Sequence, residues 1–304
     1  MPPIEVLCIG HAAYDLGVVV ERFPEENTKC ETRELLESGG GPAANAAYLL
    51  SSWGMRSAIA AVVGDDLFGQ RIHDEFECAG TNVSLLEMRP DHATPVSLIL
   101  INQQNGSRTI VNRKVDGRPL RLDKTVLAKM SPRILLFDGH ELDASLDALQ
   151  AFPKAVSILD AGSWRKGTAR LAGEVDCLAA SERFAMQATD ISSLGREEDQ
   201  VNCLRVLREK FATATVVTLG ERGLIADDGH GFRALPAFPA RTVDTTAAGD
   251  IFHGGLAFAL AKEMPLWESL RFASMTASLS VCKPGGRASI PSLAQVKEAL
   301  THVG

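Results

Sequence analysis

Short apolar runs alternate with longer segments of helical period along this chain. The first run, Val6–Ile9, is rich in β-forming residues and ends at Gly10, which is typical of a buried strand. Similar runs recur at residues 58–63, 134–137, 156–159 and 216–219, and helical patterns lie between them at residues 42–53, 67–78, 197–211 and 251–262. Buried strands that alternate with helices predict a mainly parallel sheet with helices on both faces, a three-layer α/β/α sandwich.

Two stretches break this alternation. The run Val96–Ile101, the pair Asn105-Gly106 and the run Thr109–Val111 together predict a β-hairpin, because Asn-Gly supplies the positive φ angles of a tight turn. Residues 16–36 also look extended. We expect segments of about 16–36 and 95–113 to form a small antiparallel lid sheet. No flexible linker or repeat divides the chain, so we expect a single domain over residues 1–304.

Composition and charge exclude several classes of protein. Hydrophobic residues make up 45% and charged residues 23%, as in ordinary globular proteins. The net charge is −7 and no dense Lys/Arg run occurs, so nucleic acid is not an expected partner. The six cysteines form no C-x-x-C pair, which favours reduced thiols and the cytoplasm. No signal-peptide pattern and no apolar stretch near the ~20 residues of a membrane span occur, so no membrane partner is expected.

The most specific segment is Asp244-Thr-Thr-Ala-Ala-Gly-Asp250, which leads into an apolar helix. Small residues here let backbone N–H groups of the first helical turn point at a ligand, and a helix N-terminus binds anions. Asp250 would be a carboxylate beside a bound phosphate, placed to accept a hydroxyl proton. The alternative is that Asp250 and the threonines only cap an ordinary helix.

Asp244–Asp250 resembles the C-terminal signature of the PfkB/ribokinase family of sugar kinases. Ser38–Ala47 is similar to the di-glycine motif of that family, Thr218–Gly223 to its nucleotide loop and Gly286–Pro291 to its closing segment. The motifs follow the family order over nearly the whole chain. The resemblance implies a ribokinase-like α/β sandwich with a β-sheet lid, binding of ATP and Mg²⁺, and transfer of the γ-phosphoryl group to a sugar hydroxyl.

The resemblance assigns roles to the residues of this signature. Asp250 would be the catalytic base. The neighbouring backbone N–H groups would form an anion hole, which suits phosphoryl transfer because that reaction needs positioning and charge stabilisation. Asp244 and Thr246 stand where family members bind a monovalent cation, usually K⁺. The residues of the anion hole would be Ala247, Ala248, Gly249 and Asp250.

The sugar site would lie near the N-terminal motif. Glycines such as Gly40 and Gly41 let the backbone approach a polyol, and Asn45 offers a donor and an acceptor to vicinal hydroxyls. Asp15 follows the first strand, where the family places a sugar-binding aspartate. As alternatives, Asp15 would be a turn residue and Asn45 a helix surface residue.

The nucleotide side departs from the family pattern. Nucleotide binding is expected from the loop residues Thr218, Gly220 and Gly223 and from Ser181, with Gly249 on the phosphate side. Many members carry N-x-x-E after a strand, but this chain has Ser181 and Phe184 at those positions, and Glu182 is the nearby carboxylate and metal candidate. Pro42 replaces the lysine of ribokinases, and the combined motifs look most like the sulfofructose kinase branch.

The lid chemistry suggests a substrate with an anionic end. Lys29, Asn112 and Arg113 lie in the extended segments, and His140 follows the strand at 134–137. If they converge, they would bind a phosphate, sulfonate or carboxylate of a ketohexose such as sulfofructose. The alternatives are a neutral sugar or nucleoside, with these cations forming a solvated edge. An exposed small sheet is seldom stable alone, so we also expect a homodimer through the lid.

Two other kinds of nucleotide-binding motif can be compared with this sequence. Residues 39–44 fit the dinucleotide pattern G-x-G-x-x-(G/A), with Asp65 downstream, but Arg33–Ser38 is a poor strand to precede it. The phosphate-binding Walker A loop is excluded, because the chain contains no Gly-Lys pair. The remaining alternative is a catalytically silent sugar or nucleotide sensor on the same fold.

Overall fold

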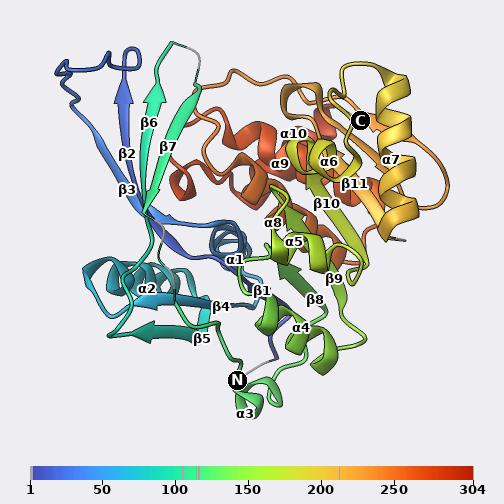
Figure 1. Ribbon diagram of the computed structural model, residues 1–304, viewed down its shortest axis with the longest axis horizontal. Helices are drawn as coiled ribbons and strands as arrows, with labels where there is room; N and C mark the ends of the chain where they lie inside the picture. The colour runs from blue at the N-terminus through green and yellow to red at the C-terminus, as the bar shows by residue number, and fades with distance from the viewer. Residues whose placement is uncertain (1–2, 105, 114, 116, 212, 304) are drawn as a thin grey trace.

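The computed structural model describes residues 3–303 except for residues 105, 114, 116 and 212 (Figure 1). Its main sheet has nine strands in the order β13-β12-β11-β10-β9-β8-β1-β4-β5. All pairs from β5 to β11 are parallel, and β12 and β13 continue the sheet in antiparallel fashion. The strands are β1 (Val6–Ile9), β4 (Ser57–Gly64), β5 (Asn82–Arg89), β8 (Ile134–Phe137), β9 (Val156–Ala161), β10 (Cys177–Ser181), β11 (Ala214–Thr218), β12 (Leu224–Asp227) and β13 (Arg233–Leu235).

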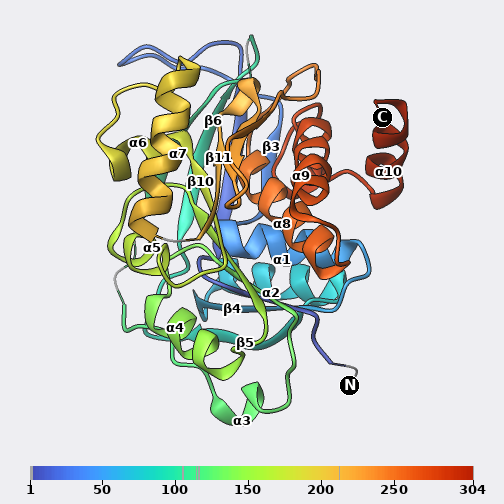
Figure 2. The same cartoon turned by 90° about the vertical axis from the view of Figure 1, so that its right-hand side faces the viewer.

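Helices cover both faces of this sheet, so the sandwich predicted from the sequence is confirmed. Val6 and Cys8 pack into one core and Leu7 and Ile9 into the other, as the alternation of side chains along a strand requires. Figure 2 shows α6 and α7 on one side and α8 and α9 on the other. The first core takes α1 (Pro42–Ser52), α2 (Leu67–Ala79), α8 (Ala248–Ala261), α9 (Leu266–Ser280) and α10 (Leu293–His302). The second takes α3 (Lys124–Leu127), α4 (Leu142–Ala151), α5 (Lys166–Leu171), α6 (Glu182–Thr189) and α7 (Glu197–Phe211).

A separate four-stranded sheet stands beside the main body, at the upper left of Figure 1. Its order is β3-β2-β6-β7, from β2 (Ala13–Val20), β3 (Leu35–Gly40), β6 (Val96–Asn102) and β7 (Arg108–Arg113). The outer pairs are antiparallel, as predicted, while the central pair β2–β6 is parallel. Gly106 in the β6–β7 turn has a φ of +69°, and Asn105 of the predicted turn lies outside the described residues. We call this sheet the lid sheet.

The two faces of the lid sheet differ in chemistry. Asp15, Ser97 and Asn112 stand opposite one another on β2, β6 and β7, so this polar row occupies one face. The next row, Leu16 with Leu98 and Val111, occupies the other face. Leu98 is 53% and Val111 59% exposed, so the second face presents an uncovered apolar surface. The face with the Asp15 row, which we call the polar face, also carries Ile99 and Ile110 in its next row, and the other face carries the exposed Leu98 and Val111.

Two boundaries differ from the sequence-based expectation. Residues 35–40 form β3, although Arg33–Ser38 was judged a poor strand. Pairing with β2 stabilises this edge strand and outweighs its weak propensity. The presence of β3 does not support a dinucleotide-binding motif at residues 39–44, because that motif follows a strand of a parallel sheet and β3 belongs to the separate four-stranded sheet. Helix α8 begins at Ala248, before the predicted start at residue 251.

Among the described helices, none is long and apolar enough to cross a membrane.

Candidate active site

The loop before α8 has the geometry of an anion site. Ala247 is the N-cap residue and adopts a left-handed conformation with a φ of 59°, which is costly for a residue other than glycine. No side chain of the described residues caps the helix, and of its first N–H groups that of Ala248 donates to the carbonyl oxygen of Thr245 at 3.2 Å, so the neighbouring N–H groups of this turn are the ones open to a ligand. A Cβ atom added at Gly249 would meet no atom within 4 Å, so the space beside the loop is open. These N–H groups and the helix dipole can together bind a phosphate.

Asp250 lies in the first turn of α8, where its carboxylate accepts a hydrogen bond from Asn45 Nδ2 at 2.7 Å. Burial and the neighbouring Asp160 together raise the pKa of Asp250 to about 7, although the Asn45 hydrogen bond and His253 oppose the shift. A carboxyl group that exchanges its proton near neutral pH is suited to general-base catalysis. The geometry therefore permits the proton transfer that the sequence suggested.

His253 and Asp160 form a buried pair one turn along α8. His253 Nδ1 lies 3.0 Å from Asp160 Oδ2, and its Nε2 lies 3.2 Å from the carbonyl oxygen of Ala179. Burial alone would lower the pKa of His253, but Asp160, Asp250 and the carbonyl group outweigh it and raise the pKa. A cationic ring here partly offsets the charge of Asp250. Sequence reasoning missed this pair, since nothing local links positions 160 and 253.

The sugar-side candidates Asp15, Gly40, Gly41 and Asn45 are brought together beside Asp250. A Cβ atom at Gly40 would lie 2.1 Å from Asp15 Oδ2, and one at Gly41 would lie 2.4 Å from the carbonyl oxygen of His11. Gly41 also has a φ of +98°. Burial raises the pKa of Asp15, and a hydrogen bond with Ser97 opposes the shift. Glycine is therefore required at both positions to avoid clashes with Asp15 and with the backbone of His11.

His140 is held by a residue that the sequence analysis overlooked. Asp138, buried directly after β8, accepts hydrogen bonds from the backbone N–H groups of His11 (2.8 Å), Ala43 (3.2 Å) and His140 (2.9 Å). Burial would raise the pKa of Asp138, but these donors and the ring of His140 hold it well below its usual range. The His140 ring lies 3.0 Å from Asp138, stacks on His11 and contacts Arg165. The sequence feature that could have identified Asp138 is an acidic residue directly after a buried strand, the end at which α/β sheets bind ligands.

The other predicted anion-binding residues lie on the lid sheet and its loops. Lys29 is exposed in the loop between β2 and β3. Asn112 lies on the polar face of the lid sheet, opposite Ser97. Arg113 falls on the other face, where it lines an apolar groove together with Leu98 and Val111, and its Nη2 donates to the carbonyl oxygen of Thr94 at 2.5 Å. The expected convergence of Arg113 with Asn112 is therefore wrong, because adjacent residues of a strand point to opposite faces.

The nucleotide-loop candidates lie at the carboxyl edge of the main sheet. Thr218 and Ser181 end the adjacent parallel strands β11 and β10 and stand opposite one another. Gly220 has a φ of +62° with open space at its Cβ position, whereas a Cβ atom at Gly223 would lie 2.0 Å from the carbonyl oxygen of Leu235. Ligands of α/β sheets bind at this edge, so the loop is well placed for one.

The side chains next to this loop are largely engaged. Ser181 Oγ accepts from Phe184 N at 3.1 Å as the cap of α6 and donates to the carbonyl oxygen of Gly162 at 2.8 Å. Glu182 accepts from Arg222 Nη2 at 2.6 Å. Phe184, which replaces the usual glutamate, is buried against Trp164. Ser181 is therefore a helix cap, and Glu182 is the ionic partner of the nucleotide loop.

Asp244 and Thr246 connect the loop before α8, which we call the anion loop, to Gly285, the residue directly before the closing segment. Asp244 Oδ1 accepts from the N–H group and the hydroxyl of Thr246, at 2.8 and 2.7 Å. Its other oxygen accepts from Gly285 N at 2.8 Å. Both residues are buried, so this network fixes the loop that precedes α8.

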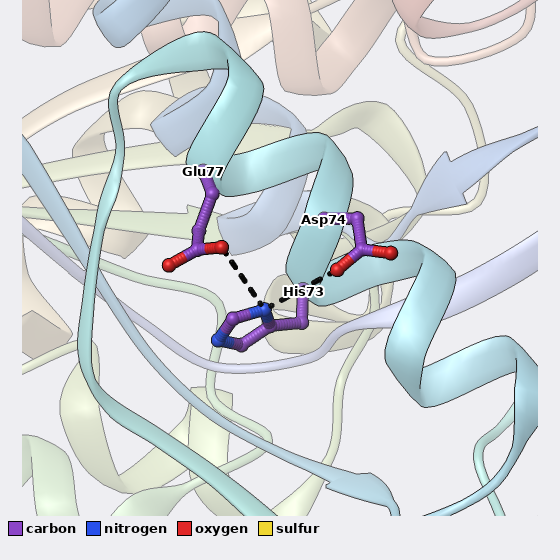
Figure 3. Close-up of side chains that lie close together, drawn as sticks. All are labelled: His73, Asp74 and Glu77. Carbon is purple, nitrogen blue, oxygen red and sulfur yellow. Dashed lines mark ion pairs between the residues drawn. The ribbon is translucent and has the colours of Figure 1, made fainter.

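A cluster of metal-binding residue types occurs away from these positions. Figure 3 shows His73 between Asp74 and Glu77 on α2, with Nδ1 at 3.6 and 3.7 Å from the two carboxylates. Among the described residues, this is the one group of three His, Cys, Asp or Glu side chains whose ligand atoms lie within 4.8 Å of one another. Asp74 and Glu77 are exposed, so the group is a charged helix surface and includes none of the predicted ligands.

The lid sheet reaches the anion loop. Arg108 Nη1 donates to Thr245 Oγ1, and a Cβ atom at Gly106 would lie 2.9 Å from the carbonyl oxygen of Val243. Arg108 shares its face of β7 with Asn112, so this face looks toward α8. The face of the lid sheet that carries Asp15 and Asn112 therefore lies toward the start of α8, where Asn45 contacts Asp250.

Comparisons with known proteins agree with this architecture. The profile of the pfkB family of carbohydrate kinases matches residues 4–293. The chain is 26% identical to a ribokinase from Lactococcus lactis over 98% of each chain. It superposes with a TM-score of 0.89 on a provisionally named ribokinase from Agrobacterium tumefaciens, at 27% identity over 99% and 98% of the two chains. An Arabidopsis thaliana ribokinase solved with ribose and ATP matches with a TM-score of 0.84 and 23% identity over 99% of each chain. The protein is thus a carbohydrate kinase, and the chain belongs to the pfkB family.

Proposed function

We propose that the protein transfers the γ-phosphoryl group of ATP to a hydroxyl group of a monosaccharide or sugar derivative, with Asp250 as the general base. The observation that carries this proposal is a buried carboxyl group with a pKa of about 7 at the uncapped start of α8. Asp250 removes the proton of the attacking hydroxyl group. The N–H groups of residues 247–250 stabilise the charge on the transferring phosphoryl group.

The sugar lies under the polar face of the lid sheet. Asp15 accepts two hydroxyl hydrogen bonds, and Gly40 leaves room for its carboxylate, because a Cβ atom there would clash with it. Gly40 and Gly41 present backbone without side chains to the sugar. Asn45 contacts the sugar and Asp250 together, which aligns the reacting hydroxyl group with the base. Asn112 lies on the same polar face of the lid sheet and is the remaining proposed sugar-binding residue.

ATP is the phosphoryl donor, as the complex of the Arabidopsis ribokinase with ribose and ATP supports by analogy. Thr218, Gly220 and Gly223 form its loop, since the positive φ angles of the glycines shape a turn at the sheet edge with open space beside Gly220. Ser181 lies beside Thr218 at this edge, and Gly249 faces the phosphates.

Membership of the pfkB family implies two cations, Mg²⁺ and K⁺. Mg²⁺ prefers oxygen ligands and supplies charge neutralisation of the phosphates. Glu182 is the carboxylate nearest in sequence to the nucleotide side, and its ion pair with Arg222 leaves one oxygen for a water-mediated contact. For K⁺, three donors already occupy most of the about four acceptor positions of Asp244. Asp244 and Thr246 therefore act first as anchors of the anion loop, and K⁺ would rely mainly on carbonyl oxygens there.

A substrate with an anionic end, such as a sulfonated or phosphorylated ketohexose, is the second candidate. Arg165 beside His140 and His11 favours it, since a guanidinium group binds such anions in bidentate fashion. A neutral sugar or nucleoside fits the rest of the site equally well, because Lys29 is exposed in a loop and Arg113 lies on the far face of the lid sheet.

The lid sheet also supports an assembly proposal. The chain forms one domain with the lid as an insertion, and the apolar row of Leu16, Leu98 and Val111, of which Leu98 and Val111 are exposed, pairs with a second copy of this chain. Burying that row removes apolar surface from water, which stabilises the dimer.

An ADP-release assay with a panel of sugars tests the activity. We expect ADP release that requires both ATP and one sugar class. ATP and sugar binding, measured by thermal shift, without ADP release for any sugar would instead assign a silent sensor.

A further inference from the structure

The buried guanidinium group of Arg287 lies behind the sugar site. Its Nε donates to Asn45 Oδ1 at 3.2 Å, and its Nη1 donates to Glu75 Oε2 at 2.5 Å. The group lies between the rings of Tyr48 and Phe76, at 4.8 and 4.7 Å from their centroids. Burying a cation costs free energy unless the cation is paired, so Glu75 is needed to stabilise Arg287 in this pocket.

Glu75 connects the same guanidinium group to the N-terminal motif. Its two carboxylate oxygens accept from the backbone N–H group of Gly39 at 3.0 and 2.9 Å. A Cβ atom at Gly39 would lie 2.2 Å from Arg287 Nη1, so glycine is needed here to admit the guanidinium group. The resulting network joins Arg287 to β3 on one side and to α1 on the other.

The chemistry of arginine fixes the orientation of the Asn45 amide. A guanidinium group can only donate, so the Asn45 atom that faces it must be the oxygen. The amide nitrogen then points at Asp250, whose ionised carboxylate can only accept. A reversed amide would place the oxygen against that carboxylate and its NH₂ group against the guanidinium donors, and both contacts would be repulsive.

We infer that Arg287 is a positioning residue: it locks the Asn45 amide so that its NH₂ group always faces the carboxylate of Asp250, and through Glu75 it holds Gly39 in the same network. This inference rests on the proposed role of Asp250 as the base. Arg287 touches neither reactant in this arrangement, because it lies on the face of β3 opposite Asp15: its contact is with Gly39, whereas Asp15 contacts the adjacent Gly40.

A measurable consequence follows for the titration of Asp250. The groups that face it are Asp160 on β9 and Asp15 on β2, which raise its pKa, and His253 on α8 and the Asn45 amide on α1, which lower it. If the amide is no longer held, its donated hydrogen bond is lost for part of the time and the pKa rises. Loss of one hydrogen bond to a carboxylate raises the pKa of that group by about one unit.

The test is Arg287→Lys, which keeps the charge but cannot bridge Asn45 and Glu75 as the guanidinium fork does. The matched control is Arg89→Lys, another buried arginine, which pairs with Glu87 at 2.7 Å on β5. We expect the acid limb of the kcat–pH profile of Arg287→Lys to move up by about one unit, which lowers kcat about fivefold at pH 7 and restores it near pH 9. Arg89→Lys should leave the limb in place.

A second variant protects the test against misfolding. Glu75→Gln combined with Arg287→Met removes both charges of the pair, so the net charge of the protein is unchanged, and apolar replacement of a buried pair is often tolerated. The same upward shift is expected. A kcat–pH profile with an unmoved limb in these variants, with only a lower melting temperature, would overturn the inference and leave Arg287 a structural residue.

A readout without substrate separates this inference from the proposed function. Protein labelled with ¹³C at aspartate carboxyl groups gives the Asp250 titration by NMR, with Asp250→Asn identifying its resonance. If no sugar supports ADP release, the proposed function fails, yet a midpoint that rises in Arg287→Lys and not in Arg89→Lys still supports the positioning role. Equal midpoints in wild type and Arg287→Lys would contradict it.

Discussion

The amide nitrogen of Asn45 lies 2.7 Å from the carboxylate of Asp250, although 205 positions separate the two residues in the chain. Asn45 lies in the first turns of α1 and Asp250 in the first turn of α8, and both helices pack into the same core against one face of the main sheet. The two N-terminal helix ends thus meet under the lid sheet. This contact joins the N-terminal glycine motif to the C-terminal signature.

The free energy of unfolding should depend on pH in a way that reflects the raised pKa of Asp250. Its pKa is about 7 in the folded protein against an ordinary value of 3.8, so the folded state holds a proton that the unfolded state releases between these values. The contribution of Asp250 to stability therefore falls as pH rises from about 4 to about 7. We expect Asp250→Asn to melt at a higher temperature than wild type at pH 8, with a gap that shrinks toward pH 5. Calorimetry at several pH values checks this, and a constant gap would contradict it.

Gly40→Ala should impair sugar binding more than folding. Its Cβ atom would lie 2.1 Å from Asp15 Oδ2, so Asp15 must turn away from the site. We expect KM for the sugar to rise at least about tenfold, the equivalent of losing one hydrogen bond to a charged group. Gly173→Ala is the control, because its Cβ atom would meet only Phe211, at 3.8 Å. Equal KM values for the two variants would exclude contact between Asp15 and the sugar.

Arg165→Met distinguishes the two classes of substrate. If Arg165 binds an anionic end, kcat/KM for 6-phosphorylated or 6-sulfonated ketohexoses should fall by about ten- to a hundredfold, while values for neutral sugars stay within about threefold. Lys29→Met, at an exposed loop position, is the comparison variant. A wild-type enzyme with equal kcat/KM for neutral and anionic sugars would remove the anionic candidate.

Leu98→Asp should dissociate the proposed dimer. Leu98 is 53% exposed on the apolar face of the lid sheet, so a carboxylate there costs the monomer little but is unfavourable in a covered interface. Sedimentation should show a dimer for wild type and a monomer for this variant. Val201→Asp, at a 41% exposed residue of α7, should remain dimeric. A wild type that is monomeric at all concentrations would rule out the lid interface.

The sequence predicted those features that depend on local pattern. Buried apolar runs located β1 and β8 because strands covered on both faces show no polar alternation. Asp250 was found because its motif is contiguous. Arg287 lies within the closing segment whose resemblance was noted, yet its role depends on Asn45 and Glu75, which only the fold brings near. Long-range contacts of this kind leave no local periodicity.

Two errors have similar physical causes. Strand β3 was underestimated because its stability comes from pairing with β2 rather than from its own residues. Arg113 was placed beside Asn112 because both belong to one segment, but side chains alternate across a strand and only the register decides which face each takes. Asp138 was overlooked because a single acidic residue after a strand carries little weight until its N–H donors are known.

The role of Asp250 as the base is tested most directly by turnover of Asp250→Asn, measured as ADP release with the best sugar of the panel. The change keeps the shape and removes the proton acceptor, so we expect kcat to fall by about 10² to 10⁴ while ATP and sugar still raise the melting temperature. Asp74→Asn, on the exposed face of α2, should retain wild-type turnover. A kcat of Asp250→Asn within about threefold of wild type would contradict the assignment, because the loss of a general base costs far more.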